Sequence, residues 1–519
     1  MICGAVQKLI DYAIKNELIT SDDLYVVLNQ LMDTLKLTDW TENDAEYTGE
    51  PIDEILAPMI TYACENGIIQ DTANSRDLFD TKLMGILTPM PREVIAEFKR
   101  RYAADPKEAT DWYFDFSKKL NYVRAGRIAK DMKWTYDCEY GTLDITINCS
   151  KPEKDPRDIA AARLSVRMDT VEHDGVSPMD LRAIKTQKAS AYPKCQLCPE
   201  NAGFAGHTTH PARQNLRPIP MTVNGEKWQL QYSPYGYYNE HCIAFNEAHV
   251  PMRIDAAVFG KLFDIVDYLP HYIIGSNADL PIVGGSILSH EHFQGGNYTF
   301  PMAKSPIEHE FSMEQYPDVK AGIVKWPMSV IRVSSENRKE LAKCCNHILE
   351  TWRAYSDESV GIFAETDGEP HNTITPIARK NGELYECDLV LRNNITTGAR
   401  PLGVFHPNPS LYHIKKENIG LIEVMGLAVL PARLAKEIAL LEDAMLNGEN
   451  LYACPELTHH AEWAEEILKC YPDFCKENAR AILEQEIGKV FLEVLEDAGV
   501  FKRTKEGKNA FMRFILSIE

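Results

Sequence analysis

A short glycine-bracketed segment of this 519-residue chain carries two histidines and a glutamine at alternate positions. If the residues from His290 to Gln294 are extended, the two-residue period of a strand places His290, His292 and Gln294 on one face, with Glu291 and Phe293 on the other. Neutral imidazole is nucleophilic near pH 7, and the phosphoramidate that it forms expels the imidazole again readily. The pattern therefore predicts a histidine that carries a phosphoryl or nucleotidyl group between two displacement steps.

The surrounding residues offer groups that can hold a phosphate without adding charge that would deactivate the nucleophile. The Gln294 amide and the Ser286 hydroxyl are neutral donors, and Gly284 and Gly285 let backbone N–H groups approach a phosphate closely. A lone His-x-His pair is more often a surface strand or a pair of satisfied core residues. The glycine-bracketed glutamine favours catalysis, and we predict that these residues bind or transfer a phosphate.

Cys195 and Cys198 are the only pair among the thirteen cysteines with the spacing of metal ligands. Two thiolates separated by two residues form half of a tetrahedral zinc site, and His249 and His290 are the natural completions. A redox pair or two buried thiols would look the same in the sequence. A redox role needs a thioredoxin-like βαβ setting, which the sequence does not indicate.

Basic residues near these motifs are candidates for binding the phosphates of a sugar nucleotide. Arg213 and Arg217 lie in one segment, and Lys415 with Lys416 lies in another, where solvated surface charge is an equally good interpretation. The whole chain carries a formal charge of −21 and has no basic stripe, which argues against nucleic acid as a partner.

The secondary structure that must position these residues is predicted to be helical at the start of the chain and mixed further along it. Apolar residues spaced by three and four predict helices over residues 1–135, which we interpret as an accessory region. Residues 136–323 and 324–519 each mix strand-like segments with amphipathic helices, as is typical of an α+β fold with antiparallel sheets. The elements recur in a similar order in these two parts, which suggests a duplicated unit. A C-terminal helix is expected to stop at Gly499.

The sequence also predicts a location for the protein. No stretch approaches the roughly 18 apolar residues that cross a bilayer, and the N-terminus lacks the basic and apolar regions of a secretory signal. We therefore expect a cytoplasmic protein with reduced thiols and no membrane partner.

Taken together, these motifs resemble the galactose-1-phosphate uridylyltransferases, most of all the longer bacterial class with an extra helical N-terminal region. His-x-His-x-Gln is the mark of the histidine-triad-like superfamily, and Glu291 stands here where the better-known class usually has proline. The resemblance covers nearly the whole chain. It implies an α+β fold of two histidine-triad-like antiparallel-sheet units: 136–323, with the nucleophile and the metal ligands, and 324–519, with the sugar-phosphate segment.

The resemblance also implies roles for individual residues. His292 would be the nucleophile that forms a uridylyl-enzyme, and Gln294 would contact the transferred phosphate. Asn201, which matches the common Cys-x-x-Cys-x-x-Asn form, would bind substrate, and Lys415 and Glu423 are the closest matches to the residues that bind the hexose phosphate. The implied metal ligands are Cys195, Cys198, His249 and His290. Zinc is the candidate ion at this site, and the alternative is a cluster in which the ligand residues persist as structure without an ion.

The function that follows is uridylyl transfer from UDP-glucose to galactose 1-phosphate by ping-pong kinetics, in galactose metabolism, with no organic cofactor and with a homodimer as a candidate assembly. A transferase that uses UTP or an amino-sugar 1-phosphate would carry the same triad, and so would a dinucleoside polyphosphate phosphorylase. A zinc-stabilised nucleotide sensor is the non-enzymatic alternative. It is disfavoured because a binder gains nothing from an imidazole in line with phosphorus.

Overall fold

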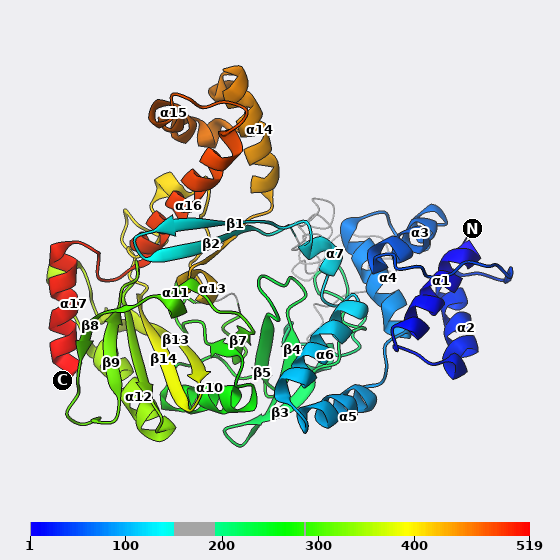
Figure 1. Ribbon diagram of the computed structural model, residues 1–519, viewed down its shortest axis with the longest axis horizontal. Coiled ribbons are helices and arrows are strands. Elements are labelled where there is room, and N and C mark those ends of the chain that lie inside the picture. Colours follow the sequence, from blue (N-terminus) through cyan, green and yellow to red (C-terminus); the bar gives the residue numbers. More distant parts are fainter. Residues whose placement is uncertain (1, 150–191, 285–286, 519) are drawn as a thin grey trace, which may run out of the picture.

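The computed structural model describes residues 2–149, 192–284 and 287–518 (Figure 1). Its N-terminal part is helical, as predicted, because apolar residues recur on one face of each helix and capping groups mark several starts. Thr72 and Asp105 accept backbone hydrogen bonds at two of these N-termini, and proline begins two helices. The helices are α1 (Ile2–Lys15), α2 (Leu24–Leu35), α3 (Ile52–Glu65), α4 (Ala73–Ile86), α5 (Pro91–Tyr102), α6 (Pro106–Lys119) and α7 (Ala125–Ile128).

A ten-stranded sheet in which every neighbouring pair is antiparallel forms the centre of the molecule. Its order is β3-β4-β5-β7-β6-β13-β14-β10-β9-β8. The strands are β3 (Ile219–Val223), β4 (Glu226–Tyr232), β5 (Cys242–Asn246), β6 (Ile273–Gly275), β7 (His292–Gly296), β8 (Ile307–Phe311), β9 (Lys320–Val324), β10 (Val330–Ser335), β13 (Asn372–Asn381) and β14 (Leu384–Asn393). A short hairpin, β11 (Glu365–Thr366) and β12 (Glu369–Pro370), stands apart from it.

The two halves of this sheet have the same strand order. From its outer edge inwards, the first half has the order β3-β4-β5-β7-β6 and the second half has the order β8-β9-β10-β14-β13. In both halves the fifth strand along the chain therefore lies between the third and the fourth, and the two fourth strands, β6 and β13, pair at the centre. In each half a helix lies between the third and fourth strands: α10 (Ala256–Tyr268) in the first half and α12 (Arg338–Ala354) in the second. The recurrence expected from the sequence is therefore present in the topology.

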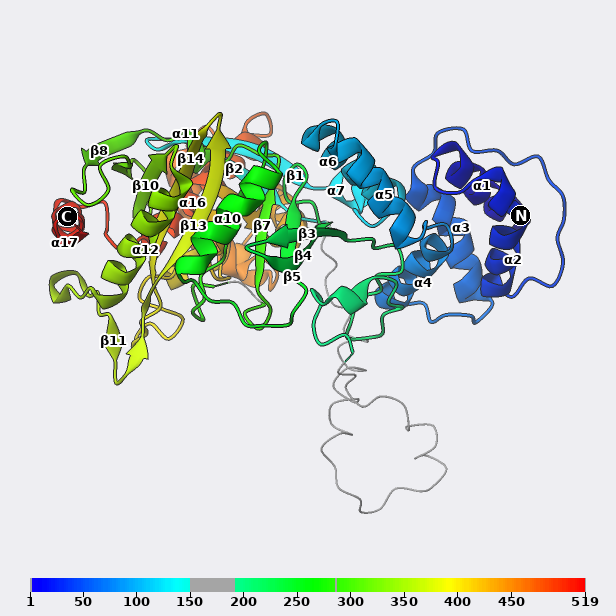
Figure 2. The same ribbon diagram turned by 90° about the horizontal axis from the view of Figure 1, so that it is seen from below.

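The helices α10 and α12 cover one face of the sheet (Figure 2). On that face Phe293 of β7 stacks on Trp228 of β4 with ring centroids 5.0 Å apart, inside the larger hydrophobic core. Because successive side chains of a strand point to opposite faces, His292 and Gln294 lie on the other face of β7.

The other face of the sheet carries a second layer (Figure 1). Its parts are a three-stranded sheet of β1 (Met132–Cys138), β2 (Gly141–Ile147) and β15 (Leu427–Leu430), the short helices α11 (Pro301–Lys304) and α13 (Leu421–Val424), and a helical lobe of α14 (Arg433–Asn447), α15 (Ala461–Cys470) and α16 (Ala479–Ala498). The last helix, α17 (Lys505–Ile518), packs on α12.

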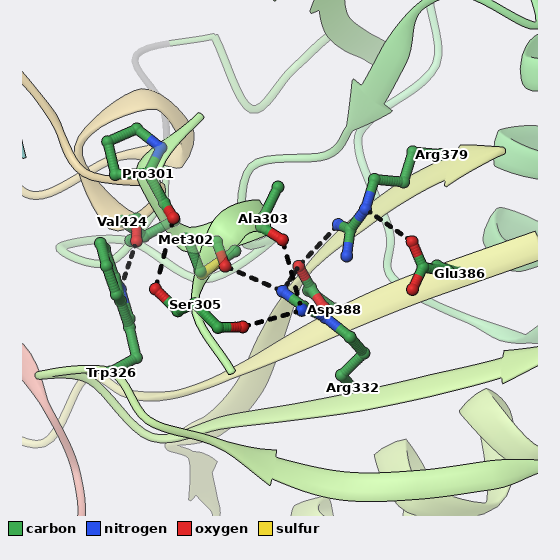
Figure 3. Close-up of polar contacts among 10 residues, drawn as sticks. All are labelled: Pro301, Met302, Ala303, Ser305, Trp326, Arg332, Arg379, Glu386, Asp388 and Val424. Atoms are coloured by element: carbon green, nitrogen blue, oxygen red, sulfur yellow. Dashed lines mark hydrogen bonds and ion pairs between the residues drawn. The ribbon is translucent and has the colours of Figure 1, made fainter. Parts of the chain in front are cut away.

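Buried ion pairs fasten this layer to the second half of the sheet (Figure 3). Asp388 of β14 is fully buried and accepts hydrogen bonds from Arg332 and from Arg379. Arg332 also donates to the carbonyl oxygens of Met302 and Ser305, which hold the α11 turn. Burial alone would raise the pKa of Asp388, but the two guanidinium groups lower it below its usual range. Arg332 and Asp388 therefore link strand β14 to the α11 turn.

Two boundaries differ in detail from the sequence-based expectation. The strand of the histidine motif begins at His292, two residues later than expected, because His290 turns towards a cluster of cysteines. The helix α16 ends at Ala498 as expected, yet Gly499 has a φ of −69° and not the left-handed conformation. A side chain at position 499 would lie 3.0 Å from the Pro327 carbonyl oxygen, so close packing explains this glycine. None of the helices in the described ranges has the length and apolar character to cross a membrane.

Candidate active site

His292 begins β7 and is buried, with 5% of its surface exposed. Its Nδ1 lies 2.8 Å from the carbonyl oxygen of His290, and since a carbonyl only accepts, Nδ1 carries the hydrogen. In the neutral ring the lone pair is then on Nε2, the atom that can attack phosphorus. Burial lowers the pKa of His292 to about 4, so the imidazole is neutral and nucleophilic at pH 7.

Gln294 is held by a buried histidine that the sequence motifs did not indicate. The Nε2 of His241 lies 3.0 Å from the Oε1 of Gln294. His241 donates in this bond, so the amide nitrogen of Gln294 remains a donor for another group. Tyr237 stacks on the His241 ring at 5.3 Å, which fixes that ring in turn.

The four predicted metal ligands converge on one point. The Sγ atoms of Cys195 and Cys198 are 3.6 Å apart, and the Nδ1 of His290 lies 3.1 Å from the first and 3.8 Å from the second. The Nδ1 of His249 lies 3.2 Å from the Cys198 sulfur. Ligands of a tetrahedral zinc ion at ordinary bond lengths are about 3.5–3.8 Å apart. The distances of 3.6 and 3.8 Å match this spacing, and the two nitrogen–sulfur distances of 3.1 and 3.2 Å are shorter, as for hydrogen bonds to sulfur. The cluster could bind a metal.

Hydrogen bonds prepare these ligands for a cation. The Nε2 of His290 donates to the carbonyl oxygen of Asn246 at 2.7 Å, which leaves the Nδ1 lone pair directed at the thiols. Asn201 donates from its amide to the carbonyl oxygens of Cys195 and Cys198, both at 2.8 Å, and accepts from the Nε2 of His210 at 2.6 Å. Asn201, predicted to bind substrate, therefore shapes the turn that carries the two thiols.

The reverse side of the motif is fastened to α10. Lys261 donates to both carboxylate oxygens of Glu291 at 2.8 and 3.0 Å, and Asn246 donates to the same carboxylate at 2.9 Å. Glu291 lies between the two motif histidines in the sequence, so its hydrogen bonds to Lys261 and Asn246 fix the backbone that carries both of them. The predicted alternation of side chains around His292 agrees with these contacts.

The segment of Lys415 and Glu423 packs beside β6, the strand that pairs with β7. The Nζ of Lys415 is 2.9 Å from the Glu423 carboxylate and 3.1 Å from the Val429 carbonyl oxygen. Asn277, which follows β6, accepts the backbone N–H of Leu421 at 3.0 Å. Lys415 is buried and paired, so the alternative of a solvated surface charge does not hold for it.

Glu423 also faces the residues that support Gln294. Burial and nearby charges, Glu423 among them, raise the pKa of the Tyr237 hydroxyl, and Tyr237 stacks on His241. On the sheet, Gly275 lies opposite Gln294, and a Cβ at position 275 would meet the Leu421 side chain at 2.8 Å. The absence of a side chain at this glycine thus lets the Glu423 segment approach β7.

The predicted arginines serve other contacts. Arg217 donates to the carbonyl oxygens of Pro89, Gln214 and Leu216 at 2.7–2.9 Å, and burial lowers the pKa of its guanidinium. It therefore ties the loop to the end of α4 and is not free to bind a phosphate, which corrects the expectation. Arg213 lies over the Tyr122 ring at 5.7 Å and donates to its neighbour's carbonyl oxygen, and its Nε has no hydrogen-bond partner among the described residues.

Gly284, the first of the two glycines before the motif, packs closely against the backbone of Ala278. Gly284 makes an isolated bridge with Ala278, and a Cβ there would lie 2.4 Å from the Ala278 carbonyl oxygen, so close backbone packing requires this glycine. Ser286 and Gly285 lie outside the described residues.

A second buried cation faces the same side of the sheet as His292 and was not predicted. Arg392 of β14 donates to the Ile419 carbonyl oxygen at 2.8 Å, and its Nη1 has no hydrogen-bond partner in the described part of the chain. Burial lowers the pKa of this guanidinium to about 10. Neither Arg392 nor His241 stands in a recognisable motif, and only the pairing of strands distant in sequence brings them to this face.

Comparisons with known proteins agree with this site. The family model of the galactose-1-phosphate uridyl transferase N-terminal domain matches residues 20–251, and that of the C-terminal domain matches residues 265–465. The chain is 50% identical over 516 residues to a galactose-1-phosphate uridylyltransferase of Clostridium acetobutylicum, covering 99% of each, and 50% identical over 523 residues to one of Fusobacterium nucleatum, covering 99% of this chain and 98% of that one.

Among solved structures, yeast Ap4A phosphorylase Apa2 matches with a TM-score of 0.31 and 12% identity, over 63% of this chain and 89% of that one. The two family matches together span most of the sequence, and the bacterial relatives align from end to end. The chain therefore belongs to the galactose-1-phosphate uridylyltransferase family.

Proposed function

We propose that this protein moves a uridylyl group from UDP-glucose to galactose 1-phosphate through a covalent intermediate on His292. The activity is galactose-1-phosphate uridylyl transfer in galactose metabolism, as in relatives that are 46–50% identical over 98–99% of this chain. One observation carries the mechanism: the Nδ1 of His292 is occupied by the His290 carbonyl oxygen, so the buried neutral ring keeps its lone pair on Nε2.

In the first half-reaction, Nε2 attacks the α-phosphorus of UDP-glucose. A P–N bond forms, the bond from phosphorus to the bridging oxygen breaks, and glucose 1-phosphate leaves with the electron pair. The ring becomes a cation that still carries the Nδ1 hydrogen, and the hydrogen bond to the His290 carbonyl stabilises that charge. No proton has to leave the ring in this step.

In the second half-reaction, a phosphate oxygen of galactose 1-phosphate attacks the same phosphorus. The P–N bond breaks and His292 returns to its neutral form. The Gln294 amide, oriented by His241, donates to a non-bridging oxygen while charge builds up on it. The Lys415 ammonium group binds the phosphate of the sugar, with Glu423 at 2.9 Å holding it in place and the Glu417 carboxylate at a longer distance of 3.8 Å.

The cysteine and histidine cluster would hold zinc in a closed site. Cys195, Cys198, His249 and His290 supply four ligands, the number that structural zinc sites use. Zinc bound there would stabilise the turn around the two thiols and, through His290, the backbone oxygen that fixes the His292 ring. The hydrogen bond from His290 to Asn246 supports this assignment, because it leaves the correct nitrogen free.

We also propose that the sheet consists of two histidine-triad-like units after the helical region. The identical strand order of the two halves supports a duplication. The expected boundary at 323/324 falls within β9, so the second unit is better taken to begin before β8. The helical region then ends before β1 rather than at residue 135, which lies within that strand.

The experiment that tests the mechanism uses the full-length protein and UDP-glucose labelled in the uridine. Without acceptor, we expect one acid-labile label per active chain and an equal amount of released glucose 1-phosphate. His292→Gly should take no label, and added imidazole should restore release of glucose 1-phosphate by accepting the uridylyl group itself. His309→Gly, at an exposed histidine of β8, is the matched control and should label as wild type.

The outcome also decides among acceptors and donors. Transfer to galactose 1-phosphate in preference to N-acetylgalactosamine 1-phosphate supports the assignment. Efficient labelling from UTP with release of pyrophosphate would replace UDP-glucose as donor, and phosphate-dependent cleavage of a dinucleoside polyphosphate would identify a phosphorylase. Turnover that survives in His292→Gly without imidazole would overturn the covalent mechanism.

A further inference from the structure

A second cluster of metal-ligating side chains lies in the C-terminal helical lobe, outside the active site. Glu437 belongs to α14, and His459 and His460 lie in the turn that leads into α15. One ligand atom from each of these three residues lies within 4.8 Å of the other two. His413 contacts the cluster from the loop that leads to Lys415.

The distances in this cluster match those around a tetrahedral ion. The Nε2 of His460 is 3.1 Å from the Oε2 of Glu437, and the Nε2 of His459 is 3.4 Å from the same oxygen. Nitrogen and oxygen ligands at zinc bond lengths are about 3.3–3.4 Å apart on a tetrahedron. Two imidazoles with one carboxylate are also a ligand set that zinc enzymes use.

One oxygen of Glu437 is crowded with nitrogen atoms. Arg433 forms an ion pair with Oε2, and both histidine nitrogens approach that oxygen as well. A carboxylate oxygen has two lone-pair directions, so three donors exceed its capacity. A cation between the rings and the carboxylate removes this conflict, because both histidines then supply lone pairs to the cation instead of competing as donors.

Supporting contacts hold the ligands from behind. The Nδ1 of His413 is 2.9 Å from the Nδ1 of His460, so His460 can donate there while its Nε2 remains a ligand. Arg433 donates to the His413 carbonyl oxygen at 3.1 Å and pairs with Glu437. His460 is fully buried, whereas the His459 side chain is 40% exposed, so a fourth position is open to water.

We propose that Glu437, His459 and His460 bind a divalent transition metal ion, with zinc as the best fit to two imidazoles and a carboxylate. The ion joins α14 to the start of α15. Through His413 it also anchors the loop that continues into the segment of Lys415 and Glu423. This site is separate from the cysteine cluster and does not depend on the proposed reaction.

The test counts zinc in the full-length protein after equilibration with Zn²⁺ and removal of free ion. His459→Ala is the decisive variant, because His459 is partly exposed and its loss should leave the fold intact. We expect this variant to hold one zinc ion fewer per chain than the wild type, and Glu437→Gln to lose the same ion. His309→Ala, at an exposed histidine of β8, should match the wild type.

A variant without the cysteine site isolates the new one. In Cys195→Ser/Cys198→Ser, Co²⁺ should give visible ligand-field bands without the near-ultraviolet bands of thiolate ligands, and adding His459→Ala should abolish them. Zn²⁺ should raise the Tm of the first of these variants but not of the second. Equal zinc content in wild type and His459→Ala, or unchanged Co²⁺ bands, would overturn the proposal and leave only a hydrogen-bonded cluster.

Discussion

The imidazole of His241 donates from Nε2 to the Oε1 of Gln294 across 3.0 Å, and its Nδ1 has no hydrogen-bond partner among the described residues. The bond decides which end of the glutamine amide can meet a phosphate. His241 is thus a positioning residue for the group predicted to contact the transferred phosphate.

The first prediction concerns this pair. His241→Phe keeps a ring beside Tyr237 but removes the donor, and we expect kcat to fall roughly 10-fold, against about 100-fold for Gln294→Ala. Because the histidine acts through the glutamine, the double variant should be no slower than Gln294→Ala alone. Steady-state kinetics on the four proteins check this, and losses that multiply would show that His241 acts independently.

The same variant should change the acid stability of the protein. Burial lowers the pKa of His241 to about 4 from a usual value near 6.5. Between these pH values the unfolded chain binds a proton that the folded one does not, so the free energy of unfolding falls as the pH drops below about 6.5. His241→Phe should lose about 2 kcal/mol less than the wild type between pH 7 and pH 5, measured by urea unfolding. Parallel pH curves would contradict this reasoning.

A third prediction concerns Asn201. Its amide fixes two carbonyl oxygens of the turn that bears Cys195 and Cys198, so Asn201→Ala should weaken zinc binding 10- to 100-fold. Competition with a chromophoric chelator measures the change. Thr209 lies in the same loop and, among the described residues, forms hydrogen bonds with His207, so Thr209→Ala should leave the affinity unaltered.

The buried charges of the second half of the sheet allow a fourth prediction. Asp388→Leu leaves both Arg332 and Arg379 without this carboxylate in a buried setting, and we expect a loss of about 3–5 kcal/mol in the free energy of unfolding. Arg332→Met/Asp388→Leu should be less destabilised than Asp388→Leu. The exposed pair of Lys469 and Glu466 gives the control, since Lys469→Ala should change stability by less than about 1 kcal/mol.

A fifth prediction compares two helical glycines. A Cβ on Gly488 of α16 would lie 2.4 Å from the Tyr136 side chain of β1, so Gly488→Ala should cost about 1–3 kcal/mol. Gly260 of α10 has open space around it, and Gly260→Ala should stabilise the protein by up to about 1 kcal/mol. Thermal unfolding of both variants measures the contrast, and a shift of the same sign in both would contradict the packing argument.

Part of the site could be predicted from the sequence because the motif residues are closely spaced along the chain. Cys195 and Cys198 are separated by a turn, and His290, His292 and Gln294 follow a two-residue period, so each group depends on short-range geometry. The long-range contacts of Cys195 with His290 and of Cys198 with His249 then bring the metal ligands together. The recurrence of elements along the chain likewise anticipated the repeated strand order.

Residues that reach the site through strand pairing were not predicted. His241 precedes β5, and its position beside Gln294 follows from the pairing of Cys242 with Gly295, a register that no local pattern encodes. Arg217 shows the opposite error. Its charge suggested that it binds a phosphate, but in the structure its guanidinium group is buried near the end of α4 and donates to backbone carbonyl oxygens.

The repeated strand order also indicates which half of the sheet can accept substitutions without loss of the reacting groups. In the first half the fifth strand, β7, presents His292 and Gln294, whereas the equivalent strand of the second half, β14, presents Asp388 and Arg392 on the same face. Asp388 braces the α11 turn through Arg332 and also pairs with Arg379, so apolar residues of similar volume at all three positions would replace these buried charges without altering the reacting groups. Efforts to make the protein more heat-resistant should therefore begin at β10 and β14 and leave the first half untouched.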